Sequence, residues 1–166
     1  MKRILMFAVG LAFVLTLVQP SPAQDLASSL VGVWKLTSVT RKEVTTDKTE
    51  KPYGEMPTGY YIYTRSGHFL WNIVADNRKA PAGSAPTDAE RIELFKSLSF
   101  GSGTYKVEGN KVLYRYDSSW HQAWTGTERA GAPEITGTKM TLKSAPFKNP
   151  ITGVDVFVVN TYQRVE

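Results

Sequence analysis

Few side chains in this sequence could take part in acid, base or metal chemistry, and they are scattered. Of the two histidines, His68 starts a strand-like segment and His121 lies in a segment rich in tryptophan. Asp117 and His121 are four residues apart, a spacing that brings side chains together on a helix but not in a strand or loop. A metal site built on two histidines would need further carboxylate ligands, so we expect no metal. We assign no catalytic residue.

Established catalytic motifs are also missing. The sequence contains no cysteine, which excludes thiol nucleophiles, disulfides and thiolate metal sites. The glycines of the triplet Gly101, Ser102 and Gly103 follow a predicted helix, so they indicate a helix end and not a phosphate-binding loop. We expect no cofactor. The sequence favours a binding protein over an enzyme and leaves an enzyme open.

Aromatic side chains give a stronger signal. Four tryptophans, eight tyrosines and seven phenylalanines lie mostly in segments that read as strands. Aromatic residues favour strands and fill cores, so a solid core is one interpretation. Since tyrosine and tryptophan also carry a polar group, a barrel lined by them would equally suit a small hydrophobic or aromatic ligand. The candidate ligand-binding residues are Tyr61, Tyr63, His68, Trp71, Tyr105, Tyr114, Tyr116, His121, Trp124 and Arg129.

The segments that would position these residues alternate between apolar and polar side chains, as strands do. Eight such segments are predicted: residues 33–44, 60–64, 68–74, 104–108, 111–117, 127–135, 138–143 and 154–164. Gly131 and Pro133 interrupt the sixth segment, so we expect it to be bulged or to lie at an edge. Both faces of residues 60–63 are apolar, which leaves open which face points inward.

The first strand begins with a glycine that suits a tight turn, Gly32, followed by a large aromatic residue, Trp34. Because side chains alternate along a strand, Trp34, Leu36 and Ser38 would share one face and Val39 would lie on the other. Trp34 would then plug the core. Eight antiparallel strands are enough to close a barrel around side chains or one small ligand.

One helix is predicted between the third and fourth strands. Thr87 and Glu90 form a capping-box pattern at its start, and Gly101 and Gly103 would end it. The loop before it, residues 76–86, is rich in alanine, glycine, proline and serine. We expect this loop and helix to act as a lid. The predicted fold is therefore all-β, an eight-stranded antiparallel barrel with one short α-helix.

The amino terminus has the pattern of a secretory signal: a basic start, an apolar run over residues 4–18, and small residues before Ala23. The run is shorter than the roughly 20 residues that span a bilayer. We expect cleavage after Ala23, a single mature domain over residues 24–166, no membrane span after cleavage, and a periplasmic or secreted protein. The net charge of +5 would fall by two on cleavage, which is too mild to indicate a nucleic-acid partner. The oligomeric state stays open.

Residues from three of these segments occur in a familiar order. They are Gly32 and Trp34 at the start of the first segment, then Pro52, Gly54, Pro57, Thr58, Gly59, Tyr60, Tyr61, Ile62, Tyr63 and Gly67 around the second, and finally Trp124, Gly126, Thr127 and Arg129 around the start of the sixth. With them the chain resembles the bacterial and fungal lipocalin-like domain family. The resemblance implies a calycin-type barrel in which Trp34 closes one end beneath an arginine from a late strand. Arg164 and Arg129 are the candidates, and we assign Arg164 to the closure.

Three functions are compatible with these observations. The leading hypothesis is an exported lipocalin-like barrel that binds a small hydrophobic or aromatic molecule at the end opposite Trp34. The second is a cofactor-free cyclase or isomerase that holds a reactive substrate in one shape. The third is a structural or protein-binding envelope module with a filled barrel. A void of a few hundred Å³ would favour the first two over the third.

Overall fold

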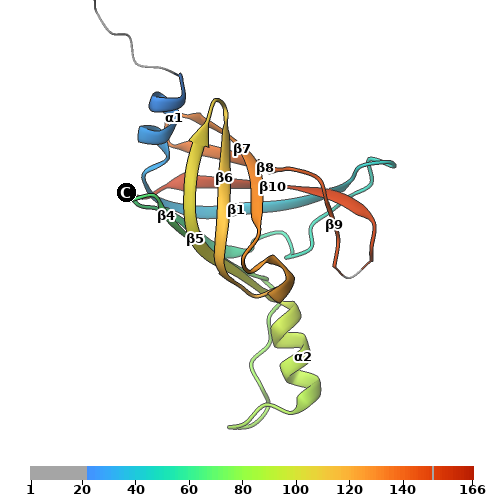
Figure 1. Cartoon of the computed structure of the whole chain (residues 1–166). Coiled ribbons are helices and arrows are strands. Elements are labelled where there is room, and N and C mark those ends of the chain that lie inside the picture. The colour runs from blue at the N-terminus through green and yellow to red at the C-terminus, as the bar shows by residue number, and fades with distance from the viewer. Residues whose placement is uncertain (1–21, 151) are drawn as a thin grey trace, which may run out of the picture.

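The structure is a computed structural model that describes residues 22–150 and 152–166. In this part of the chain, eight long antiparallel strands form a closed barrel (Figure 1). The barrel strands are β1 (Gly32–Glu43), β3 (Thr58–Tyr63), β4 (His68–Val74), β5 (Leu98–Glu108), β6 (Lys111–Ser119), β7 (Glu128–Thr136), β8 (Lys139–Ser144) and β10 (Asp155–Arg164). The other elements are α1 (Pro22–Leu30), β2 (Thr49–Glu50), α2 (Asp88–Lys96), the 3₁₀ turn η1 (Gln122–Trp124) and β9 (Phe147–Lys148).

Pairing between the first and last strands closes the sheet. Strands β3 to β8 pair in chain order, and β10 pairs with both β8 and β1. In the β1–β10 pair, Trp34 lies opposite Arg164. The predicted eight-stranded all-β barrel is confirmed by this closing pair.

Side-chain alternation decides which aromatic residues face the interior. Tyr61 and Tyr63 are 3% and 1% exposed, whereas Tyr60 is 43% exposed. The odd-numbered residues of β3 therefore point into the barrel, which answers the question that its two apolar faces left open.

Strand β1 does not keep one alternation along its length. The register with β10 shifts between Leu36 and Ser38, so Thr37 is an extra residue without an opposite partner. The shift moves Val39 to the interior, where it is 1% exposed. The prediction that Val39 lies on the face opposite Trp34 and Leu36 was wrong for this reason.

Helix α2 begins where predicted but ends earlier. The Thr87 hydroxyl accepts a hydrogen bond from the Glu90 N–H, and the Glu90 carboxylate accepts one from the Thr87 N–H, which completes the capping box. The helix ends at Lys96, and the two glycines predicted to end it, Gly101 and Gly103, lie within β5. That prediction was wrong because these glycines serve a close approach between strands: a Cβ atom at Gly103 would lie 2.0 Å from the Arg115 carbonyl oxygen.

Strand β7 lies between β6 and β8, and no register shift is found in its described pairing. The expected bulge was therefore wrong. The alternative expectation, an edge position, holds locally for residues 132–136, which pair with β8 alone among the described strands. The pairing of β7 with β6 stops at Gly131, so Pro133 lies where β7 pairs with β8 only. A residue without an N–H is tolerated at such a position.

Helix α1 lies across the barrel end at which β1 begins, and the sequence analysis did not predict it (Figure 1). The predicted signal peptide, residues 1–23, lies outside the described residues except for Pro22 and Ala23, the first residues of α1. Cleavage and secretion stay predictions. No described helix combines the length and apolar character that crossing a bilayer requires.

A cavity at the open end of the barrel

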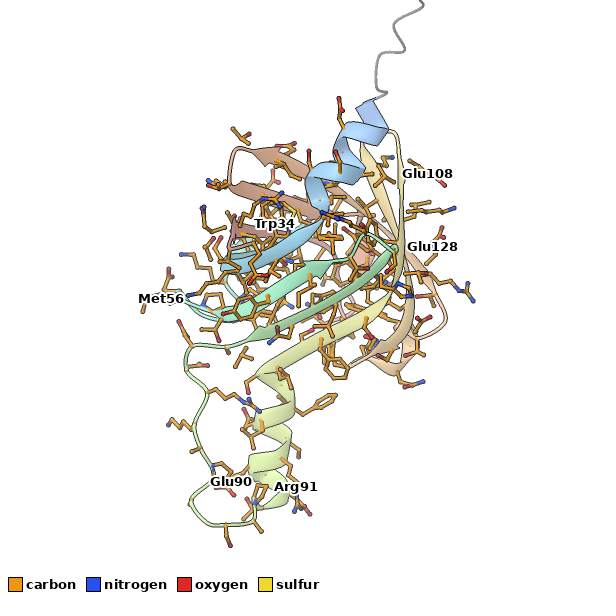
Figure 2. The ribbon with its side chains drawn as sticks, turned by 90° about the vertical axis from the view of Figure 1, so that its left-hand side faces the viewer. Trp34, Met56, Glu90, Arg91, Glu108 and Glu128 are labelled. Atoms are coloured by element: carbon orange, nitrogen blue, oxygen red, sulfur yellow. The ribbon has the colours of Figure 1, made fainter. Side chains whose placement is uncertain are left out.

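One end of the barrel is closed by Trp34, which is completely buried beneath α1 (Figure 2). Its indole N–H donates a hydrogen bond of 2.8 Å to the Leu30 carbonyl oxygen, which joins the plug to the end of α1. The Arg164 guanidinium lies 4.0 Å from the centre of the indole ring and donates hydrogen bonds to the carbonyl oxygens of Ser29 and Val31. A guanidinium stacked on an indole and bonded to two carbonyls holds strand, helix and plug together.

Tyrosines fill the half of the barrel next to this plug. The hydroxyl groups of Tyr63 and Tyr114 are 2.6 Å apart in a buried hydrogen bond, and the ring of Tyr61 stacks on that of Tyr63 at 4.4 Å between centroids. Tyr162 meets Tyr61 edge to face. Burial raises the pKa of these four tyrosines well above the ordinary value, so they are neutral donors and acceptors at physiological pH.

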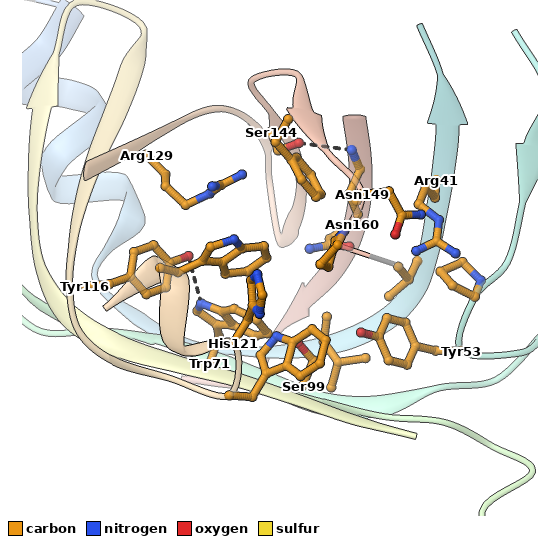
Figure 3. A pocket seen from close by; sticks show the side chains of 18 of the residues that line it. Arg41, Tyr53, Trp71, Ser99, Tyr116, His121, Arg129, Ser144, Asn149 and Asn160 are labelled. Carbon is orange, nitrogen blue, oxygen red and sulfur yellow. Dashed lines mark hydrogen bonds between the residues drawn. The ribbon is translucent and has the colours of Figure 1, made fainter. Parts of the chain in front are cut away.

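The other end of the barrel is hollow. A cavity of about 680 Å³ opens there, and strands β1, β4 to β8 and β10 provide most of its wall (Figure 3). Helix α2, turn η1 and strand β9 line its mouth. Nine aromatic side chains take part in the lining: Tyr53, Tyr61, Trp71, Phe95, Tyr114, Tyr116, Trp120, Trp124 and Phe147.

Five rings from α2, η1, the segment before η1 and β9 form an aromatic collar around the mouth: Phe95, Trp120, His121, Trp124 and Phe147. Successive ring centroids lie 5.5 Å apart between Phe95 and Trp120, 6.3 Å between Trp120 and Trp124, and 5.7 Å between Trp124 and Phe147. These spacings are typical of edge-to-face aromatic contacts. The collar therefore brings residues that are 52 positions apart into one surface.

Trp71 and Tyr116 form a polar contact deeper in the wall. The Trp71 indole N–H donates to the Tyr116 hydroxyl oxygen over 3.3 Å, as Figure 3 shows. Gly101 makes room for both rings, since a Cβ atom there would lie 2.5 Å from Tyr116 Cε1 and 2.9 Å from Trp71 Nε1. Burial raises the pKa of Tyr116, and the Trp71 hydrogen bond and the charge of Arg129 oppose that rise.

The charged groups of the lining are all basic. Arg41, Arg91, Lys96 and Arg129 line the cavity, and no aspartate or glutamate does so among the described residues. The first three each form an ion pair with a neighbouring carboxylate: Arg41 with Glu50, Arg91 with Asp88, and Lys96 with Glu93. Arg129 differs from them, because no carboxylate of the described chain lies within ion-pair distance of its guanidinium.

The Arg129 guanidinium instead lies over two rings of the collar. Its central carbon is 4.4 Å from the centre of the Trp124 ring and 4.7 Å from that of Phe147. Burial lowers the pKa of this guanidinium, and the nearby Tyr116 hydroxyl opposes the effect. The group stays charged, and the two ring faces hold it at the cavity wall.

Seven of the ten predicted ligand-binding residues line the cavity: Tyr61, Trp71, Tyr114, Tyr116, His121, Trp124 and Arg129. The other three lie elsewhere. Tyr63 belongs to the filled half, the Tyr105 hydroxyl donates to the Thr64 carbonyl oxygen, and His68 Nδ1 lies 3.1 Å from the Ser66 hydroxyl. The contacts of Tyr105 and His68 are made in the turn between β3 and β4. This turn lies at the closed end, because the last residues of β3 pair with the first residues of β1, next to Trp34.

Of the two arginines considered for the closure, Arg164 stacks on Trp34, and Arg129 lies at the opposite end. Asp117 and His121 do not form a pair within the described residues: Asp117 is the extra residue of a bulge in β6 and is exposed, whereas His121 lies in the collar. In the described part of the chain, no group of three or more metal-binding side chains converges.

Sequence reasoning missed several lining residues. Arg41 faces the cavity because the β1 bulge reverses the alternation, and nothing in the local sequence marks that bulge. Phe95 and Phe147 come from outside the long strands and reach the mouth only through the tertiary fold. Trp120 could have been named from the sequence, because it directly precedes His121, which was already a candidate.

Comparison with known proteins places this barrel in a family. A family model described as a lipocalin-like domain matches residues 31–156. An uncharacterized protein from Bacteroides eggerthii DSM 20697 is similar in structure, with 17% identity, a TM-score of 0.40, and coverage of 81% of this chain and 98% of the other. A mutant of the fluorescent protein UnaG shares 14% identity, with a TM-score of 0.36 and coverage of 84% and 98%. A comparison with curated proteins returned no match. Because the family model spans well over half of the sequence, including the strands from β1 to the start of β10, the chain belongs to the family of lipocalin-like domains.

Proposed function

We propose that this protein is exported and binds a small hydrophobic or aromatic molecule in the open end of its barrel. The observation that carries the proposal is the cavity of about 680 Å³, which lies within the usual range of about 300–1,000 Å³ for small-molecule sites. Its aromatic walls with a few polar groups are typical of such sites. A structural module with a filled barrel fits less well, because only the half next to Trp34 is filled.

An enzyme that works by holding its substrate in one shape would need a similar cavity. General acid–base catalysis would also need a proton donor and acceptor within reach of one substrate. The described lining offers no carboxylate, and Asp117 and His121 are not paired. We propose binding as the function, since the cavity alone supports it, and keep a templating enzyme as the second candidate.

Tryptophan fluorescence tests the binding proposal directly. Three of the four tryptophans, Trp71, Trp120 and Trp124, line the cavity, and Trp34 lies at the other end. We expect saturable quenching or a spectral shift with some members of a panel of fatty acids and aromatic metabolites. The signal should survive in a Trp34→Phe variant and be reduced in Trp124→Phe. No response to any compound, together with no small molecule retained in native mass spectrometry of protein from its own source, would refute the proposal.

We further propose that α2 and residues 76–86 form a lid. Helix α2 contributes Ile92 and Phe95 to the lining, although these side chains are 53% and 57% exposed. A bound hydrophobic molecule would cover part of this apolar surface and favour a closed position of the helix. Ligand should therefore slow amide hydrogen exchange in α2 and leave exchange in β3 unchanged. Equal exchange in α2 with and without ligand would contradict the lid.

The proposed export rests on the amino-terminal sequence pattern. Expression of the full chain with its own amino terminus should deliver the protein to the periplasm or medium, with Gln24 as the first residue found by mass spectrometry. A chain that remains in the cytoplasm with its first 23 residues intact would refute export without affecting the binding proposal.

A further inference from the structure

The distribution of charge around the cavity indicates the sign of the ligand. Every charged side chain of the described lining is a cation, and a low-dielectric wall strengthens the field of such groups. A cationic ligand would find no carboxylate partner in the described lining. A neutral ligand would gain no Coulomb stabilisation from these cations, whereas an anion would be stabilised by them.

Arg129 is the cation best placed to bind that anion. Carboxylates already compensate the other three basic side chains, including Arg41 across the cavity, whose Nε lies 2.5 Å from Glu50 Oε1. The Arg129 guanidinium is partly buried and has two ring faces as neighbours in place of a carboxylate. The two rings offer only π faces, so the N–H groups of this guanidinium have no hydrogen-bond acceptor within the described chain and are available for a planar or tetrahedral anion.

A second unused donor lies in the same collar. The Trp120 ring lines the cavity, and its indole nitrogen is buried and has no hydrogen-bond partner within the described chain. A buried donor without a partner is destabilising, and a rotation of this ring that brought the N–H to a ligand acceptor would remove that cost. Trp120 contacts Trp124, the ring on which Arg129 stacks, so both donors belong to one side of the mouth.

We propose that the ligand of this cavity is a hydrophobic monoanion, an aromatic or acyl carboxylate or sulfonate, whose acidic group binds Arg129 and whose apolar body lies against Trp71 and the collar. The inference rests on the proposed binding function and adds the charge and orientation of the ligand. It makes Arg129 a specificity-determining residue. The Arg164 guanidinium, by contrast, is bonded to backbone carbonyls at the closed end and is not available to a ligand.

Two pairs of probes separate charge from hydrophobicity. Anilinonaphthalene sulfonate and phenylnaphthylamine share one ring skeleton and differ in the sulfonate, and dodecanoate and dodecanol share one chain and differ in the head group. Probe fluorescence measures the first pair, and displacement of the bound dye measures the second. We expect each anion to bind at least about ten-fold more tightly than its neutral partner, as a hydrogen bond to a charged group would give.

Arg129→Met keeps an apolar stem on the rings of Trp124 and Phe147 and removes the charge. The variant should lose the ten-fold preference for the anions and bind the neutral probes as the wild type does. Arg115→Met is the matched control, because Arg115 is exposed on the outside of β6 and its loss changes the net charge equally. Thermal unfolding of each variant verifies that the barrel is folded.

The possible outcomes separate the charge assignment of the ligand from the proposed binding function on which it rests. Anions and neutral partners that bind equally, with Arg129→Met unchanged, would overturn the assignment of a monoanion and leave a hydrophobic site in place. An anion preference that Arg115→Met reduces as much as Arg129→Met would overturn the role of Arg129. Failure of all four probes to bind would overturn this inference, and together with the absence of any retained small molecule in native mass spectrometry it would overturn the binding function as well.

Discussion

Replacement of Trp34 by alanine tests how the barrel is organised from end to end. The side chain is fully buried, its N–H donates to the Leu30 carbonyl, and the Arg164 guanidinium stacks on it at 4.0 Å. Removal of a buried tryptophan costs about 3–5 kcal/mol from the lost burial and the cavity left behind. The lost hydrogen bond and stacking act in the same direction. Since small domains have unfolding free energies of about 5–15 kcal/mol, this is a large part of the total.

Urea unfolding followed by circular dichroism measures the effect. With a slope of about 2 kcal/mol per molar urea, a loss of about 4 kcal/mol would lower the midpoint by about 2 M. The ligand affinity of the folded variant should change little, because the cavity lies at the other end of the barrel. Trp71→Ala is the matched comparison: it also removes an inward-facing tryptophan, but one that lines the cavity, and it should weaken binding.

The milder variant Trp34→Phe keeps a ring beneath Arg164 and removes the donor to Leu30. It provides a folded protein if Trp34→Ala does not accumulate, and we expect it to lose about 1–3 kcal/mol. A Trp34→Ala protein with an unchanged urea midpoint and lost ligand binding would refute the reasoning. It would mean that the closed and open ends of the barrel have been exchanged.

Three further predictions concern other parts of the molecule. Burial raises the pKa of Tyr63 and Tyr162 above the ordinary 10.0, so the unfolded chain releases these protons first. The resulting stability should be complete below pH 10 and decline above it; urea midpoints between pH 8 and 11 measure the decline, and a flat profile would contradict it. Gly101→Ala should displace the rings of Trp71 and Tyr116 and reduce ligand affinity, whereas Gly109→Ala, in an open turn, should leave affinity unchanged; equal affinities for both variants and the wild type would show that the close contact is unimportant. Thr87→Ala should destabilise α2 by about 0.5–2 kcal/mol. Since α2 contains no buried residue, faster amide exchange should be confined to that helix, and a matching fall in the global urea midpoint would show that α2 supports the barrel.

The sequence was sufficient for features that depend on local alternation. The hairpin of β3 and β4 and the cap at Thr87 follow from patterns within a few residues, and the structure has them at nearly the predicted positions. Features that depend on a partner strand were not accessible. The β1 bulge at Thr37, the close approach at Gly103 and the one-sided pairing of Pro133 are all set by strands distant in sequence.

The candidate site divides in the same way. The aromatic composition predicted that large rings line an interior, and seven of the ten residues named from the sequence face the cavity. Whether the barrel is filled depends on how deep each ring lies, and alternation along a strand carries no such information. The positive charge at the mouth of the cavity could not be predicted from the sequence either. Arg41 and Arg129 are 88 positions apart, and only the structure shows that a carboxylate lies beside Arg41.

The position of both described ends of the chain has a practical consequence. Helix α1 crosses the closed end, and at the other terminus the Glu166 carbonyl accepts a hydrogen bond from the Val33 N–H beside it. A reporter, affinity tag or surface linker attached after Glu166 would therefore start at the closed end, away from the mouth. A protein immobilised through such a linker presents its cavity to the solution, so a sensor built in this way would need no internal attachment point.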